Sequence, residues 1–427
     1  MKRNALRLIP LLMVASVALS ACHSASQARP STPTPTAASS SVSQESPSAQ
    51  PTAAESTPEE PDITLTVAAT GDILPHKRLM PDTRTKGKTQ ISHLLSAIKP
   101  YIAGADLALC HQEAAVAFDG VDFEGFPEFQ MPQQWISDIK DLGYDGCSTA
   151  SNHTYDHAFE GLTHTLTTLT SHGLGTAGSQ STEKQLPYQM YDVTKDGRTI
   201  KIAHLSLTYG LNQQYARGTS AAKVLGSRPW SVNADNVDQT IEWAKQARQA
   251  GADIVIVSAH QGREYHTEPS EGQIEWGKRF AQSGVVDLYI GHHPHVPGAI
   301  TKIPGGVDGD GMWAYYSTGN LLASMQPKNT TATQAEEIAL ATITVPAHGV
   351  PHVSQAGWVA LTADLKTHRV VPISEALSSQ ASGLGESTQA VQKQYALLHQ
   401  AVGDEAVELT TPPHQDDAVK VVPEPRI

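Results

Sequence analysis

The feature that most limits the possible folds of this chain is a series of short apolar segments, each followed within three residues by Asp, Glu, Asn or His. The segments have the length and composition of buried strands. They are residues 63–69, 105–110, 144–149, 253–258 and 288–290, with further strand patterns at 201–207 and 313–317. Patterns of helical period lie between them, at residues 158–172, 234–250 and 273–282. Strands that alternate with helices indicate an α/β fold with a largely parallel sheet.

The polar residues that follow these strands are candidates for one shared site. Binding sites in α/β sheets form outside the carboxyl ends of the strands, so side chains far apart in sequence can converge there. Imidazole nitrogen, carboxylate oxygen and amide oxygen suit divalent ions such as zinc, manganese or iron. We therefore expect one or two such ions, held by a set of candidate ligands: Asp72, Glu113, Asn152, His260, His293 and His295.

The densest part of this pattern is Gly291-His292-His293-Pro294-His295, which directly follows an apolar run. In an extended or turning segment, residues i and i+2 project to the same side, and a proline between them stiffens the backbone. The other candidates each have a purely structural alternative. Asp72 can form a turn after Gly71, and Asn152 can cap the helix that follows it.

The N-terminus predicts the compartment. Residues 1–22 carry basic residues, an apolar run and the sequence Leu-Ser-Ala-Cys, the layout of a bacterial lipoprotein signal in which Cys22 is lipidated. An ordinary signal peptide is the alternative. Residues 23–61 are rich in Ser, Pro and Thr and predict a disordered tether. We therefore expect an extracytoplasmic, lipid-anchored protein, with a folded domain at 62–403 and a polar tail at 404–427.

Charge and cysteine content restrict the partners and the redox chemistry. The net charge of −13 argues against nucleic acid as a partner, and an anionic substrate would need bound cations to hold it. Apart from Cys22, the chain has Cys110 and Cys147, which could form a disulfide between neighbouring strands in an oxidising compartment. Two buried free thiols are the interpretation that the sequence favours.

Taken in order, the motifs resemble the bacterial CapA family of poly-γ-glutamate capsule-synthesis proteins, from about Thr64 to Leu322. The motifs that carry the resemblance are Gly71-Asp72-Ile73-Leu74-Pro75-His76, the Glu113 segment, Ser151-Asn152-His153-Thr154-Tyr155-Asp156, Ser258-Ala259-His260-Gln261-Gly262-Arg263-Glu264-Tyr265, Gly291-His292-His293-Pro294-His295 and Tyr316-Ser317-Thr318-Gly319-Asn320.

The resemblance implies a fold and a division of roles. That family is similar to the calcineurin-like metallophosphoesterases, which implies a four-layer α-β-β-α sandwich with two metals at strand ends. Glu113 would bridge the metals. Asp72 and His295 would bind one ion, and Asn152, His260 and His293 the other. His153, oriented by Asp156, would donate a proton or stabilise the transition state.

The sequence also departs from the family pattern near the expected site. Leu74 stands where the phosphoesterases have a histidine, so His76 is a candidate substitute, and His111 stands where the family has asparagine. Glu264, Tyr265 and Asn320 fit the pattern and, together with His76 and His111, are possible additional ligands or substrate contacts.

Three functions remain open at this stage. The first is a component of poly-γ-glutamate or similar anionic polymer synthesis, export or anchoring, with a metal-dependent hydrolase site and a synthesis or export complex as partner. The second is a metal-dependent phosphoesterase unrelated to capsule, acting on a phosphate ester. The third is a non-catalytic accessory lipoprotein.

Overall fold

The computed structural model describes residues 61–212, 227–325, 330–378, 384–414 and 418–427. These residues belong to one compact unit that begins at Pro58. The predicted signal peptide, the Cys22 lipidation site and nearly all of the predicted tether lie outside the described residues. Within the described part of the chain, none of the helices combines the length and the apolar character that a membrane crossing requires.

The first sheet has nine strands, seven of them in the order β18-β17-β16-β1-β4-β7-β8. Strands β1, β4, β7 and β8 are neighbours in that order and run parallel, while β16 runs antiparallel to β1. The short strands β15 and β19 pair with β1 and β17. The bounds are β1 (Ile63–Ile73), β4 (Leu107–His111), β7 (Gly146–Ser148), β8 (Gly175–Ala177), β15 (Asn320–Leu322), β16 (Ala335–Val345), β17 (His352–Ala363), β18 (Val370–Pro372) and β19 (Val407–Glu408).

The second sheet has seven strands in the order β13-β14-β12-β11-β10-β9-β20, and its central strands β10, β11, β12 and β14 are parallel. Two further strand pairs, β2 with β3 and β5 with β6, lie outside both sheets. The bounds are β2 (Arg84–Thr85), β3 (Lys88–Thr89), β5 (Ala115–Val116), β6 (Gln130–Met131), β9 (Gln189–Lys195), β10 (Arg198–Thr208), β11 (Ile254–His260), β12 (Leu288–His292), β13 (Ile300–Ile303), β14 (Met312–Tyr315) and β20 (Lys420–Pro423).

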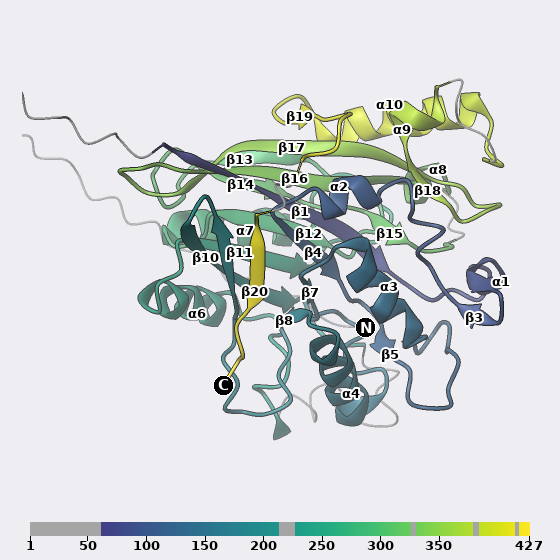
Figure 1. Cartoon of the computed structure of the whole chain (residues 1–427), viewed down its shortest axis with the longest axis horizontal. Coiled ribbons are helices and arrows are strands. Elements are labelled where there is room, and N and C mark those ends of the chain that lie inside the picture. The colour runs from purple at the N-terminus through teal and green to yellow at the C-terminus, as the bar shows by residue number, and fades with distance from the viewer. Residues whose placement is uncertain (1–60, 213–226, 326–329, 379–383, 415–417) are drawn as a thin grey trace, which may run out of the picture. The chain divides into compact units, whose positions relative to one another are not determined.

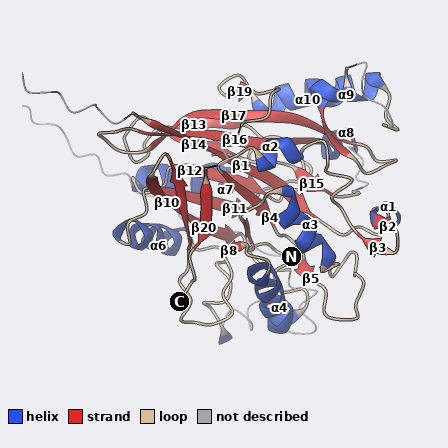
Figure 2. Cartoon of the chain, viewed as in Figure 1, coloured by secondary structure: helices blue, strands red, loops and turns tan. Residues whose placement is uncertain are grey.

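Helices cover the outer faces of the sheets (Figures 1 and 2). Helix α3 packs on the outer face of the first sheet, and α6 and α7 pack on that of the second. Helix α10 instead packs on β16 and β17 from the side of the core between the sheets. The bounds are α1 (Met80–Thr83), α2 (Lys99–Ala103), α3 (Gln134–Leu142), α4 (Ala158–Ser171), α6 (Val237–Gln249), α7 (Glu271–Ser283), α8 (Thr330–Gln334), α9 (Ile373–Ala376) and α10 (Thr388–Val402).

Alternation of side chains along the strands explains the layers. In β1, Leu65 and Val67 pack in the core between the sheets, whereas Ala68 faces the core beneath α3. In β11, Ile256 faces the core between the sheets and Val257 faces the core beneath α6 and α7. Strands that are apolar on both faces must be covered on both faces. The four-layer α-β-β-α sandwich is therefore confirmed.

Helix ends follow local capping rules. The helix predicted at 273–282 is α7, which begins earlier because Ser270 and Gln273 form a reciprocal capping box, and which ends at Gly284 with a φ of 64°. The helix predicted at 234–250 is α6, with Asn236 as its N-cap. The predicted segments were right in type and differed at their ends by a few residues.

The expectation of two free thiols is wrong, because Cys110 and Cys147 form a disulfide. The two residues lie directly opposite each other on the parallel strands β4 and β7, with their Cα atoms 4.4 Å apart. That register is set by the pairing of the strands, which the sequence of either strand alone does not reveal.

The polar segment after Gly403 belongs to the fold, which corrects the expectation of a tail outside the folded domain. Strand β20 pairs antiparallel with β9 at the edge of the second sheet. The Arg426 side chain, only 7% exposed, donates hydrogen bonds to the carbonyls of Thr176, Ser179 and Leu186. Hydropathy missed this segment because an edge strand is held largely by backbone hydrogen bonds, which hydropathy does not measure.

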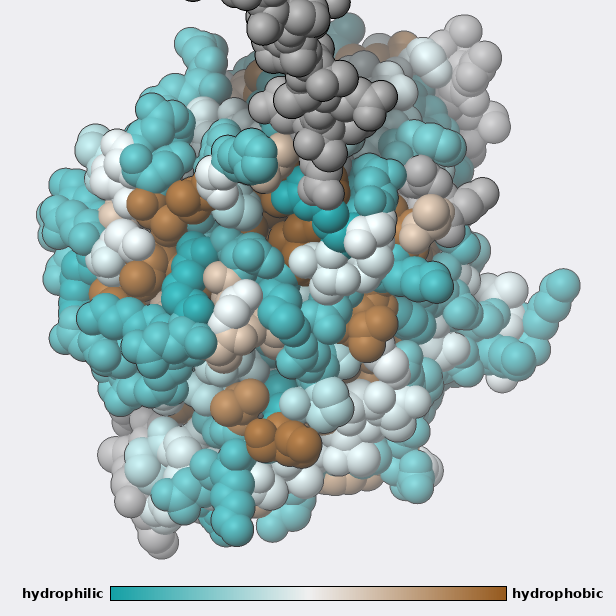
Figure 3. All heavy atoms as spheres, turned by 60° about the vertical axis from the view of Figure 1, so that its left-hand side comes forward, coloured by the Kyte–Doolittle hydropathy of each residue, from teal (hydrophilic) through white to brown (hydrophobic). Residues whose placement is uncertain are grey.

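The face shown in Figure 3 is mostly hydrophilic, and its hydrophobic residues form separate patches. Two of the large apolar side chains that are exposed on the described surface, Phe126 and Tyr265, line the same pocket.

Candidate metal centre

The carboxyl ends of four parallel strands meet at one place between the sheets. Asp72 lies near the end of β1, His111 ends β4, His260 ends β11 and His292 ends β12. All four side chains are buried. This is the convergence that the repeated strand-end pattern predicted.

Two glycines allow the strand ends to approach their neighbours closely. A Cβ atom at Gly71 would lie 2.2 Å from the carbonyl oxygen of Gly319, and one at Gly291 would lie 2.1 Å from that of Tyr316. Any side chain would force these backbones apart. The glycines that precede Asp72 and His292 therefore keep the two residues at a fixed depth between the sheets.

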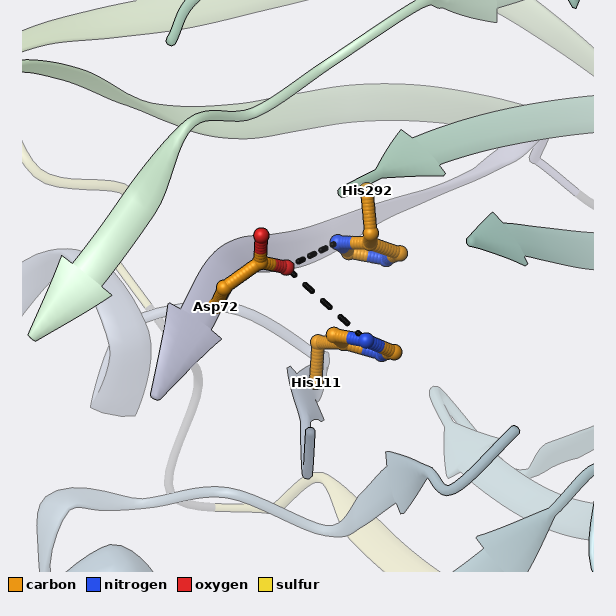
Figure 4. A group of neighbouring side chains, drawn as sticks. All are labelled: Asp72, His111 and His292. Atoms are coloured by element: carbon orange, nitrogen blue, oxygen red, sulfur yellow. Dashed lines mark ion pairs between the residues drawn. The ribbon is translucent and has the colours of Figure 1, made fainter. Parts of the chain in front are cut away.

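The carboxylate of Asp72 is surrounded by histidines. Its Oδ2 accepts from the backbone N–H of His293 at 3.2 Å and from His295 Nδ1 at 3.0 Å. Its Oδ1 lies 3.7 Å from His292 Nδ1 and 3.8 Å from His111 Nε2, as the dashed lines of Figure 4 show. Burial alone would raise the pKa of Asp72, but His295, helped by His111 and His292, lowers the pKa to about 2. Asp72 is therefore ionised at neutral pH.

Glu113 lies between the histidines of the two sides of the site. Its Oε1 is 3.8 Å from His260 Nε2 and 3.9 Å from His295 Nε2. Burial, followed by the charge of Asp72, raises the pKa of Glu113 well above its usual value. Burial lowers the pKa of His295, but Glu113 and Asp72 together raise the pKa to about 9. His295 is therefore protonated at neutral pH in the absence of a cation.

The turn at residues 293–295 has an unusual backbone that aims both imidazoles into the site. His293 and His295 have φ angles of 96° and 59°, in the left-handed region that costs a non-glycine residue about 1–3 kcal/mol. Nitrogens of the two histidines lie within 4.8 Å of each other and of a carboxylate oxygen of Glu264. The predicted projection of the i, i+2 pair to one side is confirmed.

The other side of the site is a chain of hydrogen bonds that starts at Asn152. Asn152 Oδ1 lies 2.8 Å from His260 Nε2, and His260 Nδ1 lies 2.9 Å from His111 Nε2. His111 Nδ1 in turn lies 2.7 Å from Ser148 Oγ on β7. Since His111 contacts the far nitrogen of His260, it fixes the orientation of that ring.

His153 is held beside this cluster by Asp156. Its Nδ1 lies 2.5 Å from Asp156 Oδ2, which also accepts from the backbone N–H of Phe129 at 2.8 Å. The acceptor partner places a proton on Nδ1 and leaves Nε2 facing Asn212 Nδ2 at 3.3 Å. The predicted orientation of His153 by Asp156 is what the structure shows.

The donor set fits a divalent cation. Asp72 Oδ1, both carboxylate oxygens of Glu113 and His293 Nδ1 are buried without a hydrogen-bond partner among the described residues. Buried polar atoms normally have partners, and a bound ion would supply them here. Three groups have ligand atoms within 4.8 Å of one another: Asp72 with His111 and His292, Asp72 with Glu113 and His295, and Glu264 with His293 and His295.

The structure brings most of the predicted residues together and leaves one apart. The six candidate ligands form one connected cluster. Asn320 lies at its edge, with its Oδ1 3.1 Å from His295 Nδ1. His76 belongs to none of the three possible ligand groups. Its Nδ1 accepts from the backbone N–H of Ser324, and burial lowers its pKa to about 4.

Three residues of the site were not predicted from the sequence. His292 was in the quoted motif but was not chosen as a ligand, although it ends β12 and faces Asp72. Tyr209, which packs 4.8 Å from the His293 ring, and Asn212 follow the end of β10. The strand-end rule could have identified Tyr209, but the polar residues after that strand did not look like metal ligands.

Comparison with known proteins gives the family. Residues 66–325 match the model of the bacterial capsule synthesis protein PGA_cap, which covers more than half of the chain. The protein belongs to this family. The family assignment agrees with the resemblance to CapA proteins that the motifs carried.

Two curated relatives and one solved structure illustrate the match. The PGA biosynthesis protein CapA of Bacillus subtilis is 26% identical over 267 residues, which are 61% of this chain and 64% of the relative. The capsule biosynthesis protein CapA of Bacillus anthracis is 23% identical over 266 residues, 60% of this chain and 59% of the relative. The chain thus spans less than two thirds of either relative. The calcineurin-like phosphoesterase YfkN of Bacillus subtilis aligns with a TM-score of 0.41 at 14% identity, over 80% of this chain and 98% of that one.

Replacing His111 tests its role behind His260. His111→Ala removes the partner of His260 Nδ1, and we expect the affinity for Mn²⁺ or Zn²⁺ to fall about 10- to 100-fold. His111→Gln, which keeps a hydrogen-bonding group, should lose less. His172→Ala on the exposed end of α4 is the control. Unchanged metal affinity in His111→Ala, measured by competition with a chelating dye, would exclude this role.

Metal binding should release protons. The pKa values of Glu113 and His295 are both raised, so at least one proton is bound to these residues at pH 7. A cation that binds to them displaces that proton. Apparent affinity should therefore rise as the pH increases from 6 to 9, through the pKa of about 9 of His295. Calorimetric titration in two buffers of different ionisation enthalpy counts the protons. An affinity that does not change over this range would contradict the assignment of these two residues.

Proposed function

We propose that this protein is a metal-dependent hydrolase of the phosphoesterase type that acts in the synthesis, export or anchoring of poly-γ-glutamate or a similar anionic capsule polymer. The observation that carries the hydrolase proposal is the pair of buried carboxylates, Asp72 and Glu113, enclosed by histidines from separate strands and left with unpartnered oxygens. Unpartnered buried carboxylate oxygens are costly, and a cation bound among these histidines would offset that cost.

The residues divide into ligands and a proton-handling group. In this proposal Asp72 and His295 hold one cation, Asn152, His260 and His293 hold a second, and Glu113 lies between them. The distances from Glu113 Oε1 to His260 and His295 support that bridging position. His111, already a possible additional ligand from the sequence, and His292 are further candidate ligands of the Asp72 side. When bound, divalent cations polarise a phosphoryl or acyl oxygen and lower the pKa of water.

His153 is the group that moves a proton. Asp156 holds its Nδ1–H, so that Nε2, once the ring has taken up a second proton there, would donate that proton to a leaving group or hydrogen-bond to a developing negative charge. Phe129 supports this pair from both sides, because its backbone N–H donates to Asp156 and its ring packs edge-on against His153 at 4.8 Å. Tight packing limits the imidazole to one orientation.

The capsule context comes from the relatives. The two CapA proteins are named for capsule and PGA biosynthesis, and residues 66–325, which match the family model, contain the candidate centre. A synthesis or export complex in the cell envelope is the partner that such a role requires.

The activity test compares metal-free and metal-loaded protein. We expect hydrolysis of an aryl phosphate, a phosphodiester or a γ-glutamyl polymer only after Mn²⁺ or Zn²⁺ is added. The double variant His293→Ala, His295→Ala should lose both metal and activity, whereas His153→Ala should retain metal and lose about 100-fold or more in kcat. His399→Ala, on α10, serves as the matched control. Full metal occupancy without cleavage of any substrate would favour the accessory role instead.

We also propose that the chain is a lipoprotein of the cell envelope, anchored through Cys22. The support is the N-terminal sequence, in which a basic segment, an apolar run and Leu-Ser-Ala-Cys occur in the required order. The full chain should fractionate with membranes and enter a detergent phase, and Cys22→Ala should remove it from both. Retention of the variant in the membrane fraction would show that lipid on Cys22 is not the anchor.

A further inference from the structure

A pocket of about 420 Å³ opens beside the candidate metal centre and differs from its surroundings in charge. Its lining residues are His76, Lys77, Arg78, Phe126, Tyr265, Ser324 and Met325. Two of them are cations and none is a carboxylate, although the whole chain carries a net charge of −13. Lys77 and Arg78 are exposed, and neither forms an ion pair with any residue that the structure describes.

The inner wall of the pocket reaches the centre at two points. The Tyr265 ring lies 6.3 Å from the ring of His295. His76 packs edge-on against Phe129 at 5.4 Å, and Phe129 packs against His153 in the same way at 4.8 Å. A molecule whose reacting group lies at His153 and His295 therefore extends along His76 and Tyr265 into this pocket.

The chain keeps apolar and cationic side chains in place at the outer edge. Phe126 is 66% exposed and Tyr265 is 37% exposed, so their rings present apolar surface to a ligand. The stem of Lys77 lies against Gly125, where a Cβ atom would come within 3.0 Å of Lys77 Cγ. Unpaired cations beside exposed rings are suited to bind a flexible anion, since the rings pack on its apolar stem and the cations pair with its charges.

Glu264 is a carboxylate next to the inner part of this path, and Glu124 and Glu128 line a neighbouring pocket that shares Lys77. Glu264 is adjacent in sequence to Tyr265 and forms a possible cation-binding group with His293 and His295. A cation bound by Glu264, His293 and His295 would reduce the repulsion between the Glu264 carboxylate and an approaching anion. The charge along the path is therefore compatible with an anionic substrate.

We propose that Lys77 and Arg78, with Phe126 and Tyr265, form a subsite that binds anionic groups of an extended substrate while another of its groups lies at the metal centre. This inference rests on the proposed function, because it assigns the pocket to the same site. The chemistry that Lys77 and Arg78 recognise is a repeated negative charge, carried by carboxylates or by phosphates. The preferred source is a γ-glutamyl polymer, since an extended stem separates its carboxylates and can pack on the exposed rings.

The test is a charge reversal with a matched control. The double variant Lys77→Glu, Arg78→Glu is compared with Lys278→Glu, Lys393→Glu, whose exposed lysines lie on α7 and α10. Each double variant exchanges two cations for two anions, so both acquire the same net charge. The milder Lys77→Gln, Arg78→Gln serves if the reversal disturbs folding, which the unfolding midpoint reports.

Binding is measured on the full-length, Mn²⁺-loaded protein with two probes, fluorescein-labelled poly-γ-glutamate and inorganic polyphosphate, at two salt concentrations. We expect the pocket variant to bind poly-γ-glutamate at least tenfold more weakly, with a weaker salt dependence, and the control variant to stay within twofold of the native protein. A loss confined to poly-γ-glutamate identifies carboxylates as the ligand, and an equal loss for polyphosphate identifies phosphates as well.

Two results would overturn the subsite. One is equal affinity of the pocket variant and the control variant for both probes, and the other is a native protein that binds neither probe. Metal content and hydrolysis of a small aryl phosphate are measured on the same samples. If those fail while the charge reversal weakens polymer binding, the hydrolase proposal is wrong and the subsite stands. If metal binding and hydrolysis are present while the charge reversal leaves polymer binding unchanged, the subsite is wrong and the hydrolase proposal stands.

Discussion

The burial of two carboxylates between the sheets is the constraint on which the rest of the site depends. A buried charge is costly unless hydrogen bonds or an opposite charge compensate it. Asp72 receives N–H groups from His293 and His295 and remains ionised, whereas Glu113 receives none and has a raised pKa. Burial lowers the pKa of His292 to about 4 and that of His293 to about 3, so these imidazoles are neutral and can offer lone pairs. A cation would resolve all of these deficits together.

The backbone makes this arrangement possible at some local cost. Parallel strands of both sheets end at the same place, and glycines at positions 71 and 291 let the strand ends pack against neighbouring backbone without a side chain between them. His293 and His295 adopt left-handed conformations that the surrounding structure must hold. The disulfide joins β4 and β7, the two strands that lead into Glu113 and Asn152. Strain and cross-linking thus concentrate where the side chains need to be placed.

Sequence reasoning reached the fold class and most of the site because both follow from local patterns. Asp72, Glu113 and His260 could be located from the sequence, since each follows an apolar segment within three residues. Sequence reasoning did not identify His292, because three nearby histidines share one local sequence environment and only the packing of β12 shows that His292 contacts Asp72 in addition to His295. His76, the expected substitute for a missing histidine, belongs to none of the possible ligand groups, and its Nδ1 accepts from the backbone N–H of Ser324.

By itself, the sequence determined the order of strands and helices, the candidate ligand types and the family, because periodicity and motif order are properties of local stretches of chain. Only the tertiary structure decided the pairing of Cys110 with Cys147, the inclusion of Arg426 in the fold and the contact of His111 with His260. Each of these depends on the register of strands that are far apart in sequence. Register is a property of two segments at once, and the free energy that selects it comes from packing and hydrogen bonds that form only when the sheets assemble.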